Sequence, residues 1–143
     1  MKKYIFIFFI IFQVLININI YAKEKTKVKL SFENGSAVMS MENNTAAKDF
    51  ISKLPLTLKF EDFNNIEKIC RLPEKINTDE IKTGVDPNVG DVTLYIPWNT
   101  LVFYYKDFGY YDNLVTVGHI ESGLEQLSKM GNEFEVTMEI INE

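Results

Sequence analysis

The sequence EFEVTMEI, which spans residues 133–140, alternates apolar and polar side chains from its first position to its last. Its apolar positions are Phe134, Val136, Met138 and Ile140, and three glutamates and a threonine occupy the positions between them. Successive side chains of a β-strand point to opposite faces of the sheet, so this period of two predicts a half-buried strand with an acidic outer face. Such a strand needs partner strands, because it cannot satisfy its own backbone hydrogen bonds.

Seven other segments of the chain also have strand character. Two of them flank the pair Asn34-Gly35, which is a strong hairpin signal because both central residues of a type I′ turn need positive φ. The run 101–105 is apolar and aromatic throughout, which predicts a strand that is buried on both faces. The seven segments are 28–33, 37–42, 56–61, 66–71, 92–96, 101–105 and 114–120.

Two short helices are expected between these strands. The first follows Asn44, a good N-cap residue, and ends before Pro55, which cannot continue a helix. The second begins at Ser122, which with Glu125 has the spacing of a capping box, and ends near Gly131. Short strands without βαβ repeats favour a mainly β fold, and closure removes the exposed edges of a sheet. We therefore expect a closed eight-stranded antiparallel barrel with two short helices.

The N-terminal segment is different in kind from the rest of the chain. Lys2 and Lys3 precede an uncharged stretch, residues 4–22, that is mostly apolar and ends at Ala22. This pattern predicts a signal peptide over residues 1–22, which leaves one domain over 23–143 that is exported to the periplasm or outside the cell. The alternative is an uncleaved membrane anchor over residues 4–22, a stretch nearly long enough to span a bilayer. Cleavage removes two lysines and changes the formal charge from −5 to −7.

Composition excludes several classes of site. The chain has one histidine, one cysteine and one arginine, which excludes a multi-His metal site, a Cys-rich zinc site and an internal disulfide. An acidic chain with a single arginine also argues against nucleic-acid binding, which needs clustered cations. No metal and no cofactor is expected. Cys70 lies between apolar neighbours and is expected to be buried.

Two sequence blocks carry a resemblance to a known family. The first is Leu-Pro-Leu-Thr-Leu at 54–58, and the second combines Gly-Asp-Val at 90–92 with Pro-Trp-Asn at 97–99. Together they resemble the bacterial cyclophilin-like domain family over about residues 27–141. The resemblance implies an eight-stranded cyclophilin-type barrel with two helices. It implies no particular reaction, and the Phe-His-Arg and Gln-Gly-Gly-Asp stretches of true cyclophilins are absent from this sequence.

Two residues are candidates for catalysis, and no catalytic group is assigned. Arg71 is the only guanidinium available for an atypical prolyl isomerase, and it shares a strand face with Ile69; the alternative is a surface cation. His119 is the only imidazole, and strand alternation places it on the face of Val115 and Val117. That placement favours a structural histidine over a catalytic base.

A cluster of aromatic residues is the candidate binding site. An aromatic groove can hold a peptide, a proline ring or a small apolar ligand, and the alternative is core packing. Trp98 is the strongest candidate because Pro97 and Asn99 place it in a turn. The binding candidates are Trp98, Tyr95, Tyr105 and Phe103, and the segment 104–111 is a possible partner surface.

Three functions fit these observations. The first is an exported module that binds a peptide or a small apolar ligand in an aromatic groove. The second is an atypical peptidyl-prolyl isomerase that uses Arg71 and the same groove. The third is a structural or interaction domain tethered to the membrane by an uncleaved N-terminus.

Overall fold

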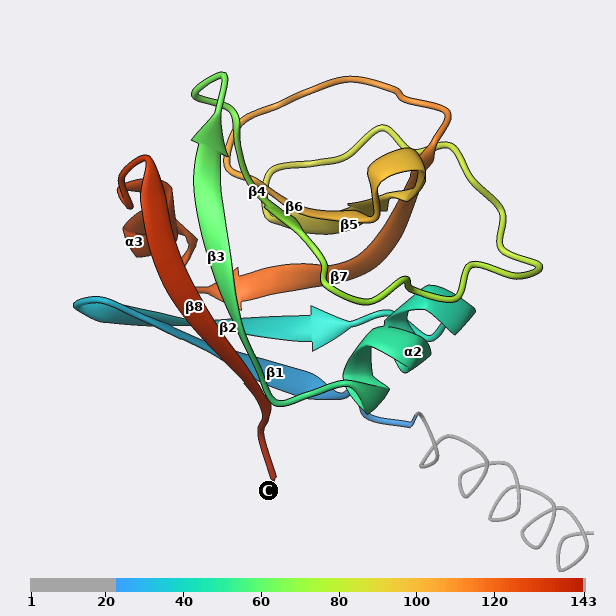
Figure 1. The fold of residues 1–143 in the computed structure, drawn as a ribbon, viewed down its shortest axis with the longest axis horizontal. Coiled ribbons are helices and arrows are strands. Elements are labelled where there is room, and N and C mark those ends of the chain that lie inside the picture. Colours follow the sequence, from blue (N-terminus) through green and yellow to red (C-terminus); the bar gives the residue numbers. More distant parts are fainter. Residues whose placement is uncertain (1–22, 143) are drawn as a thin grey trace, which may run out of the picture.

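The protein folds as a closed barrel of eight antiparallel strands (Figure 1), as the sequence predicts. The computed structural model describes residues 23–142, so the predicted signal segment lies outside the described residues. The strands are β1 (Lys27–Phe32), β2 (Gly35–Met41), β3 (Leu56–Phe63), β4 (Glu67–Arg71), β5 (Asp91–Tyr95), β6 (Thr100–Tyr104), β7 (Leu114–Ser122) and β8 (Glu133–Ile140). Around the barrel their order is β1-β2-β7-β5-β6-β4-β3-β8.

The inward faces of the strands form one hydrophobic core. β8 pairs with β1 on one side and β3 on the other, and its Val136 and Met138 are fully buried. The ring of Phe60 stacks on Phe103 with centroids 4.7 Å apart. The strand predicted over 133–140 is therefore confirmed. Closure of the barrel gives it a partner strand on each side. Cys70 is also buried, as expected, and its burial raises the pKa of the thiol to about 11.

Two helices cover opposite ends of the barrel. Helix α2 (Thr45–Ser52) precedes the start of β3, whereas α3 (Leu124–Ser128) precedes β8, which pairs with the far end of β3. Asn44 fixes α2 in place: its Oδ1 accepts from Ala47 N at 2.9 Å, and its Nδ2 donates to the Thr116 carbonyl of β7 at 2.8 Å. Within residues 23–142, no helix has the length and apolarity needed to cross a membrane.

Two local predictions are wrong in detail. The hairpin turn consists of Glu33 and Asn34, and Gly35 already pairs with Phe32 in the sheet; only Asn34 has positive φ. Ser122 does not cap α3, because it still belongs to β7, where it pairs with Val38. The N-cap of α3 is instead Gly123, whose φ of 84° lets the chain leave β7 where a side chain would meet β2.

A bulge in β7 changes the side on which His119 lies. The pairing of β7 with β5 shifts register between Val92 and Thr93, so that one extra residue of β7 is accommodated. Val115 and Val117 face the core, as their alternation predicts, but His119 is 45% exposed. The expectation that these three side chains share one face is wrong, because a bulge interrupts the period of two.

Candidate functional site

The barrel carries a second, smaller apolar cluster on its outer surface. Val102 and Tyr104 of β6 and Leu114 of β7 are buried there, outside the main core. Strand β6 is buried along its whole length, with Leu101 and Phe103 facing inward. The prediction that this strand is buried on both faces is confirmed. Two long loops cover the outward-facing residues of this strand.

The covering loops are 78–90 and 105–113, which extend beyond β5 and β6 in Figure 1. They are tied together by two backbone hydrogen bonds between Val85 and Tyr111, with N–O distances of 3.2 and 2.9 Å. Gly84 N also donates to the Leu114 carbonyl at 3.0 Å, and Gly90 N donates to the Tyr104 carbonyl at 2.8 Å. These bonds hold the aromatic residues of the loops over the outer face of β6.

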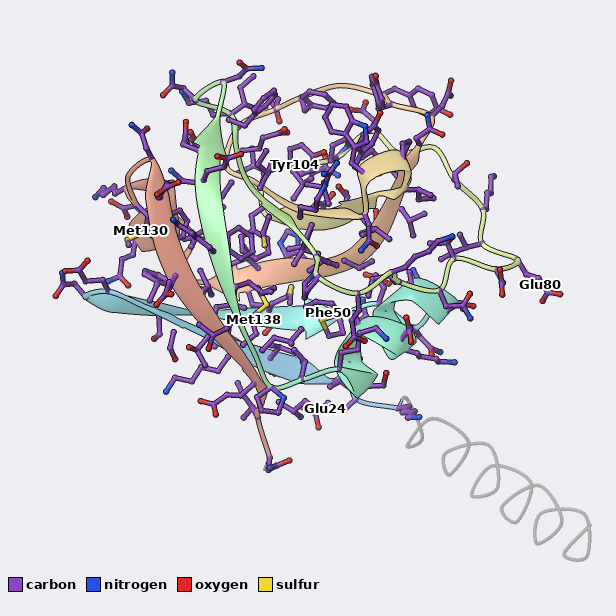
Figure 2. The ribbon with its side chains drawn as sticks, viewed as in Figure 1. Glu24, Phe50, Glu80, Tyr104, Met130 and Met138 are labelled. Atoms are coloured by element: carbon purple, nitrogen blue, oxygen red, sulfur yellow. The ribbon has the colours of Figure 1, made fainter. Side chains whose placement is uncertain are left out.

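Between the loops and the strands lies a hollow of about 190 Å³, which we call the outer groove. Its floor comes from β4, β6 and β7, and Tyr104 marks its place among the side chains of Figure 2. Its aromatic walls form a continuous series of contacts. Ring centroids lie 5.5 Å apart for Trp98 and Tyr95, 5.9 Å for Tyr95 and Tyr111, 6.1 Å for Tyr111 and Phe108, and 5.6 Å for Phe108 and Tyr104.

Local backbone geometry positions Trp98 at the rim of this groove. Pro97 lies in a 3-10 turn, η2 (Ile96–Trp98), and Asn99 ends that turn in the left-handed region with φ of 49°. Asn99 also donates its side-chain amide to the Glu74 carbonyl at 2.7 Å and accepts from Ile76 N at 3.0 Å. Trp98 itself is 62% exposed.

The groove also contains a buried acidic side chain, Glu67 at the start of β4. Glu67 is only 8% exposed and lies between Phe63 of β3 and Tyr104 of β6, its cross-strand neighbours. Within residues 23–142, its Oε2 is the one fully buried side-chain oxygen or nitrogen without a hydrogen-bond partner. Burial, together with the charge of Asp62, raises the pKa of Glu67 to about 7.

Two of the four predicted binding residues lie in the groove. Trp98 and Tyr95 line it. Phe103 does not, because alternation along β6 turns it inward, where it is fully buried against Phe60. Tyr105 follows the end of β6 and points to the end of the barrel, so the placement of these two residues in the groove is wrong.

Tyr105 belongs instead to a closed polar cluster. Its hydroxyl donates to Asp62 Oδ1 at 2.6 Å, and Lys68 Nζ lies 2.8 Å from the same oxygen. Lys68 also donates to the Met130 carbonyl at 2.6 Å and lies over the Tyr105 ring, 5.1 Å from its centroid. Burial alone would raise the pKa of Asp62, but the hydrogen bonds from Lys68 and Tyr105 outweigh it and lower that pKa below its usual range.

The two candidate catalytic residues lie apart from each other. Arg71 is exposed on the outer face of β4 and lines a neighbouring hollow of about 340 Å³, to which Trp98 also contributes. His119 lines neither this hollow nor the outer groove. Its Nδ1 lies 2.8 Å from Asp91 Oδ1. The structure thus brings Arg71 and Trp98 together and leaves His119 outside.

A family model described as the cyclophilin-like family matches residues 30–139, which is most of the chain. The chain belongs to the cyclophilin-like family. Among solved structures, this cyclophilin-like barrel is similar to the solution structure of the hypothetical protein AF2241 from Archaeoglobus fulgidus, with a TM-score of 0.68. The two share 14% sequence identity over 82% of this chain and 95% of that one, which shows a common fold. No curated protein matches the sequence.

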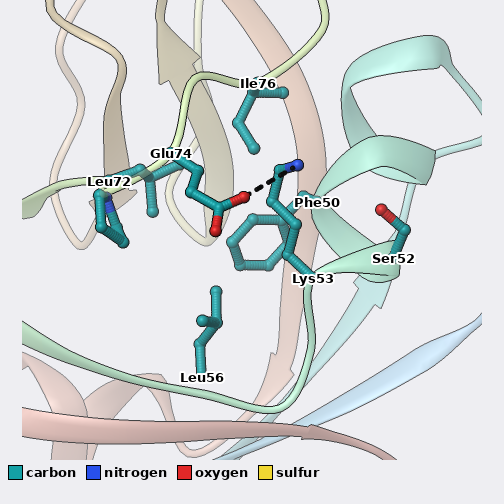
Figure 3. Close-up of a pocket in the computed structure, with 8 residues that line it drawn as sticks. Phe50, Ser52, Lys53, Leu56, Leu72, Glu74 and Ile76 are labelled. Atoms are coloured by element: carbon teal, nitrogen blue, oxygen red, sulfur yellow. Dashed lines mark ion pairs between the residues drawn. The ribbon is translucent and has the colours of Figure 1, made fainter.

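A larger hollow lies near α2 in the cyclophilin-like barrel (Figure 3), with a volume of about 370 Å³. It is bridged by an ion pair between Lys53 Nζ and Glu74 Oε2 at 3.5 Å. Glu74 is largely exposed, and the polar groups drawn in Figure 3 include none that is buried without a partner. The outer groove combines aromatic walls with a buried unpartnered carboxylate, so it is the stronger candidate site despite its smaller volume.

Sequence reasoning missed several groove residues of this cyclophilin-like chain. Phe108 and Tyr111 lie in the segment 104–111, where only a general partner surface was expected. Glu67 had no signal of its own, because a glutamate in a strand is normally an exposed residue. Its neighbours Phe63 and Tyr104 come from other strands, and local periodicity does not predict those contacts.

Proposed function

We propose that this cyclophilin-like protein is a binding module that takes an apolar group of a peptide or small molecule into the outer groove. One observation carries the proposal. Residues 23–142 contain five exposed aromatic side chains, and four of them line this groove: Phe63, Trp98, Phe108 and Tyr111. These four are between 42 and 62% exposed. Large apolar side chains gathered at one concave place are typical of a binding site.

Trp98 provides a direct test of binding, because it is the only tryptophan in the chain. We expect a neutral apolar probe such as cyclohexylmethanol, or a proline-containing tetrapeptide, to change its fluorescence in a saturable way. Tyr111→Ala should weaken that binding about 5- to 10-fold, since a lost aromatic contact costs roughly 1 kcal/mol or more.

Tyr110→Ala is the matched control, because Tyr110 is 64% exposed but does not line the groove. It should leave the affinity unchanged. The proposal is wrong if neither the alcohol nor the peptide gives saturable binding, or if both tyrosine variants weaken binding equally.

A second candidate is an atypical prolyl isomerase, and one observation favours it. Arg71 and Trp98 line the same hollow, so a guanidinium and an aromatic ring are available to one proline-containing segment. In the tetrapeptide experiment this function would appear as accelerated cis–trans exchange of the proline bond, abolished by Arg71→Ala. We expect no such acceleration, because Arg71 does not line the outer groove.

We further propose that the domain acts outside the cytoplasm after its N-terminal segment is removed. The support comes from the basic start, the apolar stretch and Ala22 before a charged segment. We expect the intact mass of protein purified from its own cell envelope to correspond to a chain that starts at Lys23. A mass that includes residues 1–22 would contradict cleavage and favour the tethered domain.

A further inference from the structure

We propose that the outer groove binds an alkylammonium group, with the aromatic rings around the cation and the Glu67 carboxylate as its counter-charge. This inference rests on the proposed function and names the chemical class of its ligand. It is carried by three features of the groove: a buried carboxylate oxygen that lacks a partner, aromatic residues on both neighbouring strands, and no ion pair with a cation of the protein's own.

The Glu67 carboxylate has no hydrogen-bond donor at Oε2, although that atom is fully buried. An unpartnered buried charge is costly, and proteins normally pair it or neutralise it. Its cross-strand neighbours, Phe63 and Tyr104, present aromatic surface. The groove therefore lacks one N–H or O–H donor that would satisfy Glu67, and a ligand can supply it.

The walls of the groove suit a cation. Phe63 and Tyr104 flank Glu67 on the neighbouring strands, and the Phe108 ring lies beside Tyr104 with centroids 5.6 Å apart. The face of an aromatic ring attracts a cation, so rings beside a carboxylate suit an ammonium group.

The protein's own cations do not occupy this place. No ion pair among residues 23–142 includes Glu67. Lys68 follows it directly, but alternation along β4 turns Lys68 to the barrel end, where Asp62 and Met130 bind it. Arg71 faces the neighbouring hollow. A cation beside the ionised Glu67 would therefore have to come from a ligand.

A metal ion does not fit the same donors. Ca²⁺ needs about six to eight oxygen ligands, and Glu67 is the only acidic residue that lines the groove. No group of three or more His, Cys, Asp or Glu that could hold a metal is found in the described part of the chain. An alkylammonium group needs one carboxylate and apolar surroundings for its carbon atoms, which this groove offers.

The test compares cyclohexylmethylamine with cyclohexylmethanol, two probes of similar shape of which only the amine is charged. At pH 8 we expect the amine to bind at least about tenfold more tightly than the alcohol. Below pH 7 the amine affinity should fall by up to about tenfold per pH unit, because Glu67 becomes protonated while the amine stays charged. The alcohol affinity should not change with pH.

The other groups that face Glu67 do not produce this pH dependence. Asp62, on β3, has a lowered pKa and remains charged over this range. Tyr104, on β6, and Tyr105, which follows it, remain neutral because burial raises the pKa of each phenol to about 12.

Two variants and one control make the test specific. Glu67→Gln should reduce amine binding to the level of the alcohol and remove the pH dependence. Phe108→Leu keeps an apolar side chain but removes a ring face beside Tyr104, so it should weaken the amine more than the alcohol. Glu33→Gln, in the exposed β1–β2 turn, should change neither affinity.

A capped lysine, N-acetyl-lysine methylamide, distinguishes the two sources of such a group. Binding as tight as that of the amine indicates a lysine side chain of a peptide, and binding of the amine alone indicates a small molecule; both support the proposal. Equal, pH-independent binding of amine and alcohol would overturn it while leaving the proposed function intact. If neither binds, this inference is wrong, and if the proline-containing tetrapeptide also fails to bind, the proposed function is wrong as well.

Discussion

Replacing Asp62 by alanine is expected to lower the free energy of unfolding by about 3–5 kcal/mol, the usual cost of breaking a buried ion pair. Asp62 Oδ1 lies 2.8 Å from Lys68 Nζ and accepts the Tyr105 hydroxyl at 2.6 Å. The Lys68 side chain is 3% exposed, so without Asp62 its charge would stay buried with the Met130 carbonyl as its remaining protein acceptor. Urea unfolding of the two proteins at neutral pH measures the difference.

The chain contains a matched control for this change. Lys59 and Glu133 also form an ion pair at 2.8 Å, but both side chains are 63% exposed. Glu133→Ala should therefore lower the free energy of unfolding far less than Asp62→Ala does, because solvent screens an exposed pair. Equal losses in the two variants would contradict the view that burial gives the Asp62–Lys68 pair its importance.

The pH dependence of Asp62 has a definite sign. Its pKa is lower in the folded protein than the ordinary value of 3.8, so its stabilising contribution is present above that value. The contribution is lost as the pH falls through the lower, folded pKa. The stability difference between the parent protein and Asp62→Ala should thus shrink as the pH falls below 3.8.

The barrel was predictable because its strands carry local signals. Val136 and Met138 alternate with polar residues, and the apolar run of β6 indicated burial on both faces. Asn44 was recognisable as a cap because a cap bonds to a backbone N–H only three residues away. These features depend on residues near one another in the chain, which is the information that periodicity contains.

The candidate site was less predictable because it depends on distant contacts. His119 changes face at a bulge, which is set by the pairing of β7 with β5. Glu67, on β4, is buried where Phe63 of β3 and Tyr104 of β6 lie beside it, and strand pairing sets both contacts. Trp98 was recognised because its own turn signals its position, whereas Glu67 has no local signal of that kind.

Replacing Glu67 by methionine is expected to stabilise the protein at pH 8 by roughly 3 kcal/mol more than at pH 4. Burial raises the pKa of Glu67 from 4.5 to about 7, so the folded state holds the proton more tightly than the unfolded state. The stability of the parent protein therefore falls as the pH rises from about 4.5 to 7, and the penalty is complete above 7. Methionine has a similar size and no charge, so this penalty disappears. Urea unfolding of the two proteins at both pH values measures the difference in the free energy of unfolding.

Glu33→Met serves as the control, because Glu33 is exposed in the β1–β2 turn and should show no such change between the two pH values. A stability difference for Glu67→Met that does not grow with pH would mean that the carboxylate is hydrated in the groove and is not held as a buried group.

If this stability difference does grow with pH, the protein retains a side chain that weakens its fold at neutral pH. Natural proteins keep such groups mainly where they serve a function, and the same variant should abolish the preference for cyclohexylmethylamine over the alcohol. A glutamate that binds a cation is expected to destabilise the protein when no ligand is bound and to favour the amine over the alcohol. A structural glutamate would do neither.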